Sequence, residues 1–462
     1  MSALWSMPMT RLAALLRAGD VSAVEVAESV LGRIDETEPR VRAWAHVDPK
    51  LVRDSAARAD RLALSGGHLG PLHGIPIGVK DVIDVRGMPT AAGSDAVDFH
   101  IACTDAGAVA SLRDSGAIIA GKTVTHEFAF GQGTPPTINP RDPLRYAGGS
   151  SVGSGVAVAV GSAHGALGTD TGGSVRNPAA VNGLVGMKPS AGLIVGSGVL
   201  HISDSLDQIG PIARSTGDCA LLLEGMVMPE RRAQFRAGAI PPRGAERRRV
   251  AVDRRTWAAW GVAPVVRDVI DEALRAMQRQ GVEIIEVELP ELDLALPASL
   301  ALSLSESVAH HRGRLAGASE RYLPETRVMI ETGALVTAAD RELACRVRDF
   351  VRTRIVELFQ QLGIVALASP TLPSIAPLAA TMSHHLTGET GSESLSSALQ
   401  MLTTANLTGL PALSVACGFT GGLPVGLHLL GLEFTDGLLL DIAKDYEEST
   451  DWSSHVPVGS LP

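Results

Sequence analysis

The sequence contains 462 residues, of which 45% are hydrophobic and 19% are charged, and its formal net charge is −10. This composition is typical of a globular chain with a large core, and it excludes a disordered or a fibrous protein. The mild negative charge gives no electrostatic reason to expect a nucleic acid or an anionic membrane as a partner.

The first half of the chain alternates helix and strand signals. Ser22 and Glu25 form a Ser-x-x-Glu capping box, which predicts the start of a helix ahead of "VAESVLGRI". In "IPIGVK", residues 75–80, apolar residues alternate with other residue types, as they do in a β-strand. The other elements expected here are helices at 51–65 and 106–114, a buried strand at 117–120, and a buried helix in "GVAVAVGSAHGA" that leads into a strand "ALG".

The second half of the chain repeats this alternation. The expected elements are strands at 250–253, 282–290 and 364–370, helices at 264–280, across 296–361 and at 436–448, and a Ser- and Gly-rich mobile loop at 374–396. Strands and helices that alternate along the whole chain favour an α/β fold in which helices cover a central sheet.

Targeting and redox features predict a cytoplasmic location. The N-terminal "MSALWSMPMTRLAALLRAGD" has neither the long apolar core nor the cleavage site of a signal peptide. No apolar run reaches about 18 residues without polar breaks, so we expect no membrane span. The cysteines show no metal-ligand or redox spacing, and we expect reduced thiols at Cys103, Cys219, Cys345 and Cys417.

The segment "GAIIAGKT", residues 116–123, matches the P-loop pattern GxxxxGK[ST] of nucleotide-binding proteins. A P-loop presents backbone N–H groups from a glycine-rich turn between a strand and a helix. The four residues between these glycines are Ala-Ile-Ile-Ala, which favour a strand. Nucleotide binding is therefore only an alternative hypothesis, which a thermal-shift assay with ATP and magnesium would test.

Two further patterns suggest chemistry that their surroundings disfavour. "GSSVG", residues 149–153, matches the nucleophile elbow of α/β-hydrolases with Ser151 at its centre, but a loop precedes it where the elbow needs a strand. His384 and His385 stand together in a polar loop without the carboxylate spacing of a metal site. We therefore expect neither an elbow nor a metal, and the sequence indicates no cofactor.

Ser174 follows two glycines in "GTDTGGSVR", residues 168–176, and is a candidate nucleophile. A serine hydroxyl needs a neighbour that accepts its proton. His164 and His201 flank the motif, and either could form a Ser-His-Asp arrangement with Asp170. Spacing excludes neither histidine, because such partners meet in space rather than in sequence.

Lys80, at the end of the predicted strand "IPIGVK", is another candidate base. Its apolar neighbours indicate burial, and burial disfavours a charged amine and lowers its pKa. A neutral lysine at pH 7 requires a decrease of at least ~3 pH units from about 10.4, which corresponds to about 4 kcal/mol. The alternative interpretation is a strand-end lysine in an ion pair with Asp81 or Asp84.

Three motifs together resemble the signature of the amidase signature family of serine hydrolases. They are "GVKD" at 78–81, "GGSSVGSG" at 148–155 and "GTDTGGSVRNPAAVNGLVGMKP" at 168–189. The resemblance covers nearly the whole chain. It implies a single domain, 1–462, whose mostly parallel or mixed, twisted sheet is covered by helices on both faces, with a core motif block at 70–215 and variable pocket segments at about 291–400.

The resemblance also implies roles for individual residues. Ser174 matches the nucleophile, Lys80 matches a buried neutral base, and Ser150 matches a bridging serine whose preceding peptide bond, from Gly149, is cis in the family. The implied oxyanion-hole donors are the backbone N–H groups of Thr171, Gly172, Gly173 and Ser174, and the implied supporting residues of this loop are Asp170 and Arg176.

Val152 stands where the family usually has glycine, and because valine rejects left-handed dihedrals we expect an ordinary backbone conformation there. The acyl pocket is expected among variable segments. The candidates are Phe128, Ala129, Phe130 and Gly131, the helices in 300–350, and the loop 374–400. No basic cluster is obvious among them, which favours a neutral acyl or aryl group over a substrate that carries a carboxylate.

These patterns predict an amidase that cleaves the C–N bond of a small or aryl amide through a serine acyl-enzyme, with ester or carbamate hydrolysis as side activities. The expected partners are the amide and water, and the expected state is a monomer or a homodimer without nucleic acid, membrane or cofactor. The alternatives are the glutaminase subunit of a tRNA-dependent amidotransferase, the P-loop protein, and a catalytically silent protein of the same fold.

Overall fold

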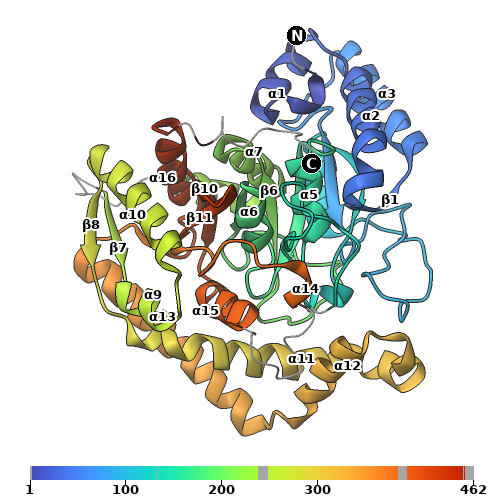
Figure 1. Ribbon diagram of the computed structural model, residues 1–462. Coiled ribbons are helices and arrows are strands. Elements are labelled where there is room, and N and C mark those ends of the chain that lie inside the picture. The colour runs from blue at the N-terminus through green and yellow to red at the C-terminus, as the bar shows by residue number, and fades with distance from the viewer. Residues whose placement is uncertain (1–2, 132, 238–247, 383–392, 451, 453–462) are drawn as a thin grey trace.

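An 11-stranded mixed sheet passes through the molecule and contains strands from residue 44 to residue 430 (Figure 1). The structure is a computed structural model, and it describes residues 3–131, 133–237, 248–382, 393–450 and 452. The strand order is β1-β3-β2-β4-β6-β5-β10-β11-β9-β7-β8. Strands β10 and β11 therefore lie in the interior of the sheet although they come last in the chain.

The strands are short and regular. In chain order they are β1 (Trp44–Val47), β2 (Pro76–Lys80), β3 (Ile118–Thr123), β4 (Gly165–Asp170), β5 (Val185–Lys188), β6 (Gln208–Ala213), β7 (Arg249–Val252), β8 (Glu283–Glu286), β9 (Ala366–Pro370), β10 (Ala412–Thr420) and β11 (Leu423–Leu430). Strand β2 runs parallel to β3 and β4, and β7 runs parallel to β8 and β9. The other neighbouring pairs are antiparallel. The sheet is therefore mixed, which is one of the two expected arrangements, and it is not mostly parallel.

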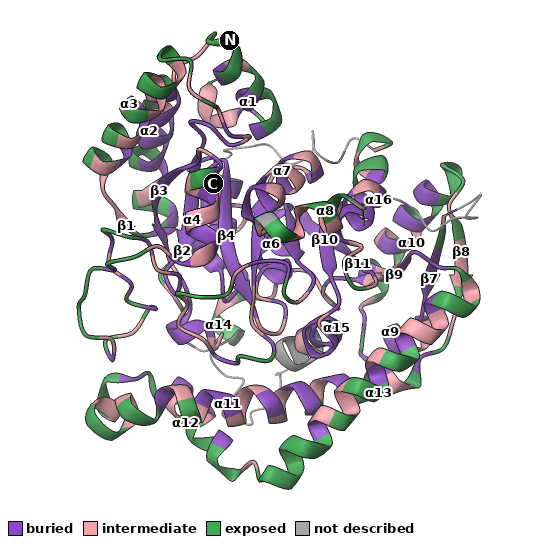
Figure 2. Cartoon of the chain, turned by 180° about the vertical axis from the view of Figure 1, so that it is seen from behind, coloured by how far each residue is buried: buried purple, intermediate pink, exposed green. Residues whose placement is uncertain are grey.

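Helices cover the sheet on both sides (Figures 1 and 2). They are α1 (Met9–Ala18), α2 (Ala23–Val41), α3 (Pro49–Leu64), α4 (Gly107–Asp114), α5 (Val152–Ala159), α6 (Arg176–Asn182), α7 (Thr216–Met226), α8 (Arg232–Ala237), α9 (Arg254–Ala259), α10 (Pro264–Arg279), α11 (Ala295–Ala318), α12 (Pro324–Thr332), α13 (Ala338–Leu362), α14 (Ala379–Met382), α15 (Glu393–Thr408) and α16 (Asp436–Glu448). All five residues of β2 are buried, because β3 and β4 flank it and α2 and α5 pack on it.

Local signals in the sequence located many of these elements correctly. The capping box at Ser22 forms as predicted, with the Glu25 N–H donating to the Ser22 hydroxyl at 3.1 Å and the Ser22 N–H donating to the Glu25 carboxylate at 2.8 Å. The predicted loop 374–396 is wrong at residues 379–382, which form α14, and at residues 393–396, which form the first turn of α15. Its two histidines, His384 and His385, lie outside the described residues.

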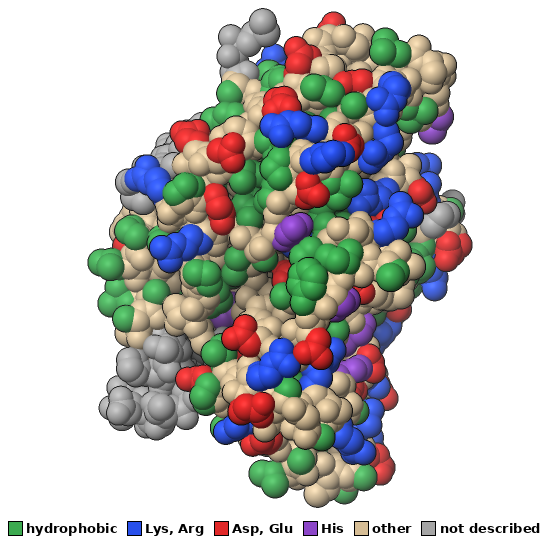
Figure 3. Space-filling view, turned by 90° about the vertical axis from the view of Figure 1, so that its right-hand side faces the viewer, with side chains coloured by type: hydrophobic (Ala, Val, Ile, Leu, Met, Phe, Trp, Pro, Cys, Tyr) green, Lys and Arg blue, Asp and Glu red, His purple; other side chains and the backbone are tan. Residues whose placement is uncertain are grey.

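Helices α11, α12 and α13 form an arm along one side of the molecule (Figure 1). By length and composition alone, the helical stretch Pro290–Arg321 meets the criterion for a membrane span, with a mean hydropathy of 1.2 in its most apolar window, but a core helix of a globular protein meets the same criterion. This stretch packs against α13 and α15, and Leu302 and Glu306 are among its buried residues. On the face drawn in Figure 3, acidic and basic side chains are interspersed.

Candidate active site

The site lies where two neighbouring parallel strands end. Strand β2 ends at Lys80 and β4 ends at Asp170, and their register places Val79 opposite Leu167. Helix α5 begins just after Ser150, and α6 begins just after Ser174. The carboxyl ends of parallel strands and the loops that follow them are the usual place for a ligand site in α/β proteins.

Lys80 is fully buried, and its amine contacts hydroxyl groups rather than carboxylates. The Nζ atom lies 2.7 Å from the Ser150 Oγ and 2.7 Å from the Thr169 Oγ1. Burial lowers the pKa of Lys80 from 10.5 to about 7, although the charges of Asp207 and Asp170 oppose this decrease. A large fraction of such an amine is neutral near pH 7 and can accept a proton.

The alternative ion pair of Lys80 does not form. Asp81 instead binds Lys122 Nζ at 2.9 Å, in a buried pair on the neighbouring strand. Because Gly121, Lys122 and Thr123 all lie in β3, "GAIIAGKT" is a strand and not a phosphate-binding turn. The P-loop alternative is therefore wrong at the level of local structure.

A backbone hydrogen bond holds the segment that carries Ser150 next to Ser174. The Ser151 N–H donates to the Ser174 carbonyl at 3.3 Å, and the Gly149–Ser150 peptide bond is cis. Ser150 is buried, whereas Ser174 is half-buried. Ser151 is occupied by the backbone of Thr169, to which its hydroxyl donates at 3.2 Å, so it is not the exposed serine of a nucleophile elbow.

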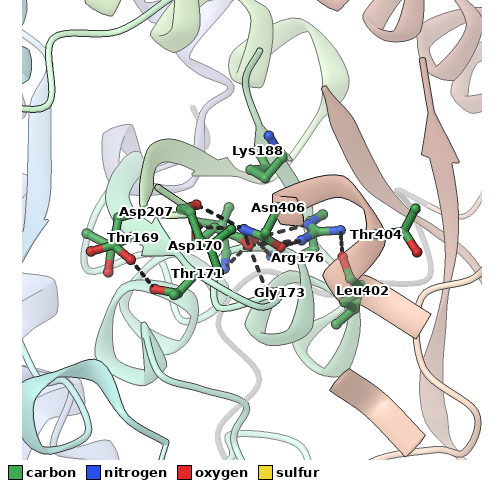
Figure 4. A network of polar contacts seen from close by, with 12 residues as sticks. Thr169, Asp170, Thr171, Gly173, Arg176, Lys188, Asp207, Leu402, Thr404 and Asn406 are labelled. Atoms are coloured by element: carbon green, nitrogen blue, oxygen red, sulfur yellow. Dashed lines mark hydrogen bonds and ion pairs between the residues drawn. The ribbon is translucent and has the colours of Figure 1, made fainter. Parts of the chain in front are cut away.

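Asp170, Arg176 and Asn406 form a buried network under the loop that carries Ser174 (Figure 4). Arg176 binds both carboxylate oxygens of Asp170, at 2.9 and 3.0 Å, and the Asn406 amide donates to the Asp170 carboxylate at 2.9 Å. Burial would raise the pKa of Asp170, but the charge and hydrogen bonds of Arg176 outweigh it and hold this pKa well below its usual range. The carboxylate is therefore ionised, and it organises the loop.

Among the predicted oxyanion donors of the Thr171–Ser174 loop, Gly173 must be corrected. The Gly173 N–H donates to the Asp170 carboxylate at 2.7 Å, so it is engaged within the protein. The backbone N–H groups of Thr171, Gly172 and Ser174 remain as the predicted donors. Gly173 has φ +117°, and a Cβ there would overlap the Leu402 side chain, so the turn requires glycine.

Gly149 is surrounded by side chains that the sequence did not indicate. A Cβ at Gly149 would overlap the Tyr146 hydroxyl and the His126 ring. The backbone N–H of His126 donates to the Ser150 carbonyl at 3.2 Å, so His126 contacts this segment through both its ring and its backbone. Burial lowers the pKa of His126 to about 3, and the charge of Lys80 acts in the same direction, so the imidazole is neutral.

The two histidines considered as bases have other partners. His164 precedes β4, at the opposite end of that strand from Ser174, and its Nε2 lies 3.0 Å from the Leu4 carbonyl. His201 Nδ1 lies 3.1 Å from the Asp207 carboxylate. Lys80 is thus the titratable group whose side chain lies against the Ser150 hydroxyl.

The predicted pocket residues lie close to the arm. Phe128 is buried, with its ring centroid 4.6 Å from that of His311 and 5.2 Å from that of Tyr322. Ala129 is also buried, while Phe130 and Gly131 are half-buried, and a role for these four residues in substrate binding stays a prediction. Val152 is the first residue of α5, in the ordinary conformation expected for it.

Sequence reasoning missed two residues that hold the site together. Thr169 lies inside the quoted motif and binds Lys80, but nothing in its pattern distinguishes it from a strand threonine. Asn406 lies in α15, far along the chain, and its sequence neighbours do not indicate its contact with Asp170. The described residues contain no group of three or more His, Cys, Asp or Glu side chains that could hold a metal ion.

Comparison with known proteins identifies the class to which this fold and site belong. A sequence model of the Amidase family matches residues 25–440. An amidase from Pseudomonas putida is 36% identical over 99% of both chains. One of the subunits of glutamyl-tRNA(Gln) amidotransferase from Roseiflexus sp. (strain RS-1) is 35% identical over 96% of both chains. A crystal structure of an amidase superposes with a TM-score of 0.84, at 32% identity, and covers 96% of this chain and 99% of that chain.

The protein is therefore an α/β enzyme of the kind that cleaves carbon–nitrogen bonds. The chain belongs to the Amidase family, as its motifs suggested. The two relatives compared by sequence are named for different activities, although their identities to this chain are nearly equal.

Proposed function

We propose that this protein is a stand-alone amidase that hydrolyses a small or aryl amide through an acyl-enzyme on Ser174. The single observation that carries this proposal is the contact of 2.7 Å between the buried Lys80 amine and the Ser150 hydroxyl, beside the backbone of Ser174. A buried amine that is not paired with a carboxylate can serve as a base near neutral pH.

The proposed relay first moves protons from Ser174 through Ser150 towards Lys80, and it then moves them back to the leaving group. Neutral Lys80 accepts the Ser150 proton while Ser150 accepts the Ser174 proton, and the Ser174 Oγ bonds to the amide carbon. Lys80 then returns its proton to Ser150 while Ser150 gives a proton to the leaving nitrogen, and the C–N bond breaks. Water repeats the attack on the acyl-enzyme, which releases the acid and restores Ser174.

Charge on the carbonyl oxygen is taken up by the backbone. The proposed donors are the N–H groups of Thr171, Gly172 and Ser174, and loss of one such donor typically costs roughly 3 kcal/mol of transition-state stabilisation. Asp170 is not a proton acceptor in this scheme, because Arg176 keeps it ionised and it already binds loop N–H groups.

The test uses the purified chain with a panel of anilides, aliphatic amides, carbamates, aryl esters and glutamine. We expect hydrolysis of at least one anilide or small amide, covalent labelling of Ser174 by a fluorophosphonate, and loss of both in Ser174→Ala. The matched control is Ser151→Ala, which should keep its label at Ser174. A native chain that neither takes the label nor cleaves any amide would contradict the proposal and favour the catalytically silent alternative.

The second candidate is the glutaminase subunit of a tRNA-dependent amidotransferase, because one relative named as part of such an enzyme is 35% identical over nearly the full chain. This candidate predicts that the chain alone is inactive on anilides and gains glutaminase activity in a stable complex with partner subunits. Anilide hydrolysis by the isolated chain, with little activity on glutamine, decides in favour of the amidase.

A further inference from the structure

Asp207 lies just before β6, and its side chain contacts Thr171 in the loop that carries Ser174 (Figure 4). It is 6% exposed, and one carboxylate oxygen accepts the Thr171 hydroxyl at 2.6 Å. The other oxygen accepts the Ile202 N–H at 2.9 Å and contacts His201 Nδ1 at 3.1 Å. The carboxylate is therefore a fixed element of the site rather than a mobile surface charge.

Two carboxylates hold the loop at its two ends. Asp170 binds the N–H groups of Gly173 and Val175, and Asp207 binds the side chain of Thr171. The proposed oxyanion donors lie between these anchors. A donor contributes to catalysis only when its direction is fixed before the charge develops, so the Thr171 anchor has a direct consequence for turnover.

Asp207 also lies near Lys80, because Thr169, whose hydroxyl contacts the Lys80 amine at 2.7 Å, lines the same cavity as Asp207. The charges of Asp207 and Asp170 both raise the pKa of Lys80 against the effect of burial, whereas the nearby His126 is neutral. Asp170 shares its charge with Arg176 in a buried pair, whereas the cationic partner of Asp207 among the described residues is His201, which is charged only when protonated. The negative charge of Asp207 is consequently less fully compensated than that of Asp170.

His201 has several acidic and basic neighbours. Hydrogen bonding to Asp207 raises the pKa of His201, burial opposes this increase, and the charge of Asp204 supports it. The His310 ring lies 6.1 Å from the His201 ring, and His310 itself contacts Asp204 at 3.3 Å. Thr169, His201, Asp204 and Asp207 together line a cavity of about 380 Å³.

We propose that Asp207 is a positioning residue of the reaction, which orients the oxyanion loop through the Thr171 hydroxyl and stabilises, through its charge, the ammonium form that Lys80 adopts after accepting a proton. The inference rests on the proposed relay through Lys80 and Ser150. It assigns two separable effects, a hydrogen bond and a charge, to one carboxylate.

Two variants separate the hydrogen bond from the charge, with kcat and the pH profile of kcat/KM on a cleaved anilide as readouts. Thr171→Val keeps the shape and the charge but removes the hydroxyl, so kcat should fall roughly tenfold or more while the acid limb of the profile stays in place. Thr171→Ser should restore most of kcat. Asp207→Asn removes the charge, so the acid limb should move to lower pH by at least ~0.5 unit, because the ammonium form of Lys80 loses its support.

Asp204→Asn is the matched control, since Asp204 lines the same cavity but its contact is with His310. It should leave kcat and the acid limb unchanged. Equal shifts in Asp204→Asn and Asp207→Asn, or a native profile in Asp207→Asn, overturn the inference. Native kcat in Thr171→Val overturns it as well, even where Asp207→Asn does not fold.

Failure of the proposed function is distinguishable from failure of this inference. A native chain without anilide hydrolysis or a label at Ser174 removes the relay itself. An active native chain whose Asp207 and Thr171 variants behave like the native protein removes only the role of Asp207.

Discussion

Lysine side chains are rarely fully buried, yet Lys80, Lys122 and Lys188 are all fully buried here. Their environments differ. Lys122 contacts the Asp81 carboxylate, Lys188 donates to the Pro189 carbonyl at 2.7 Å, and Lys80 contacts two hydroxyls. Burial lowers the pKa of both Lys80 and Lys188 to about 7. The two amines differ in that Lys80 contacts Ser150, so a variant of Lys188 can serve as the control for a variant of Lys80.

The residue-scale prediction compares Lys80→Met with Lys188→Met. Lys80→Met should lower anilide turnover by at least ~10³-fold, because units of this kind fail when any member is lost. Lys188→Met should retain most of the activity, since Lys188 has no role in the proposed relay. Steady-state kinetics on both variants check this, and comparable losses in both would contradict the assignment of Lys80.

Stability should respond to pH in the same way for both lysines. Between the folded pKa of about 7 and the unfolded value of 10.5, the unfolded chain binds more protons than the folded chain, so the free energy of unfolding rises with pH. Below pH 7 both states are protonated and the penalty is complete. Each Met variant should therefore lose a slope of up to about 1.4 kcal/mol per pH unit, measured by urea unfolding between pH 7 and pH 9.

At the scale of elements, strand β4 and helix α6 are joined by a turn whose geometry depends on Arg176. This side chain binds the Asp170 carboxylate, the Leu402 carbonyl at 3.0 Å and the Asn406 amide oxygen at 2.8 Å. It also contacts the His428 ring at 2.9 Å. One guanidinium thus connects β4, α6, α15 and β11, and a lysine cannot reproduce its planar set of donors.

Arg176→Lys should consequently destabilise the protein by about 2–4 kcal/mol and lower kcat, because the buried Asp170 carboxylate loses part of its compensation. The control is Arg275→Lys on α10, where the Arg275–Glu272 pair at 2.9 Å is about half exposed on both sides. Such a pair contributes little, so the control should stay within about 0.5 kcal/mol of the native protein. Chemical denaturation of both variants measures the difference, and equal stabilities would show that the buried network does not support the turn.

Elements specified by neighbouring residues were predictable from the sequence. The capping box located α2, and the final helix begins and ends at the predicted residues 436 and 448. The buried helix expected in "GVAVAVGSAHGA" ends early, at Ala159, because the chain must turn before β4 starts at Gly165. Periodicity contains no information about such a turn, since it records which face is apolar and not where tertiary contacts stop the helix.

The candidate site was predictable where its residues lie in contiguous motifs. Lys80, Ser150 and Ser174 fall in three glycine-containing segments that were singled out by their resemblance to the motifs of the amidase signature family, whereas reasoning from the residues alone left His164 and His201 open as bases. Thr169 and Asn406 did not stand out, because their roles arise from pairing across the sheet and from the packing of α15 on the loop. The Gly173 donor was misassigned for a similar reason, since only the folded chain shows that Asp170 occupies it.

The whole molecule is held together by a hairpin that the chain adds last. Strands β1 to β6 form one part of the sheet and β7 to β9 form another, and β10 and β11 join them. Strand β10 pairs with β5, and β11 pairs with β9, both antiparallel. Strand order depends on contacts between residues far apart in the chain, which periodicity does not encode.

A chain that ends at Thr408, before β10, should therefore fail to form the native structure. It keeps nine of the eleven strands, but β5 and β9 each lose one of their two neighbouring strands, and the exposed strand edges favour aggregation. A chain that ends at Trp452 retains all the described elements and is the matched control. Circular dichroism and size-exclusion chromatography of both chains check this. A soluble, cooperatively unfolding chain 1–408 would show that the two parts of the sheet fold independently, and the C-terminal hairpin would then be an addition to the fold rather than its centre.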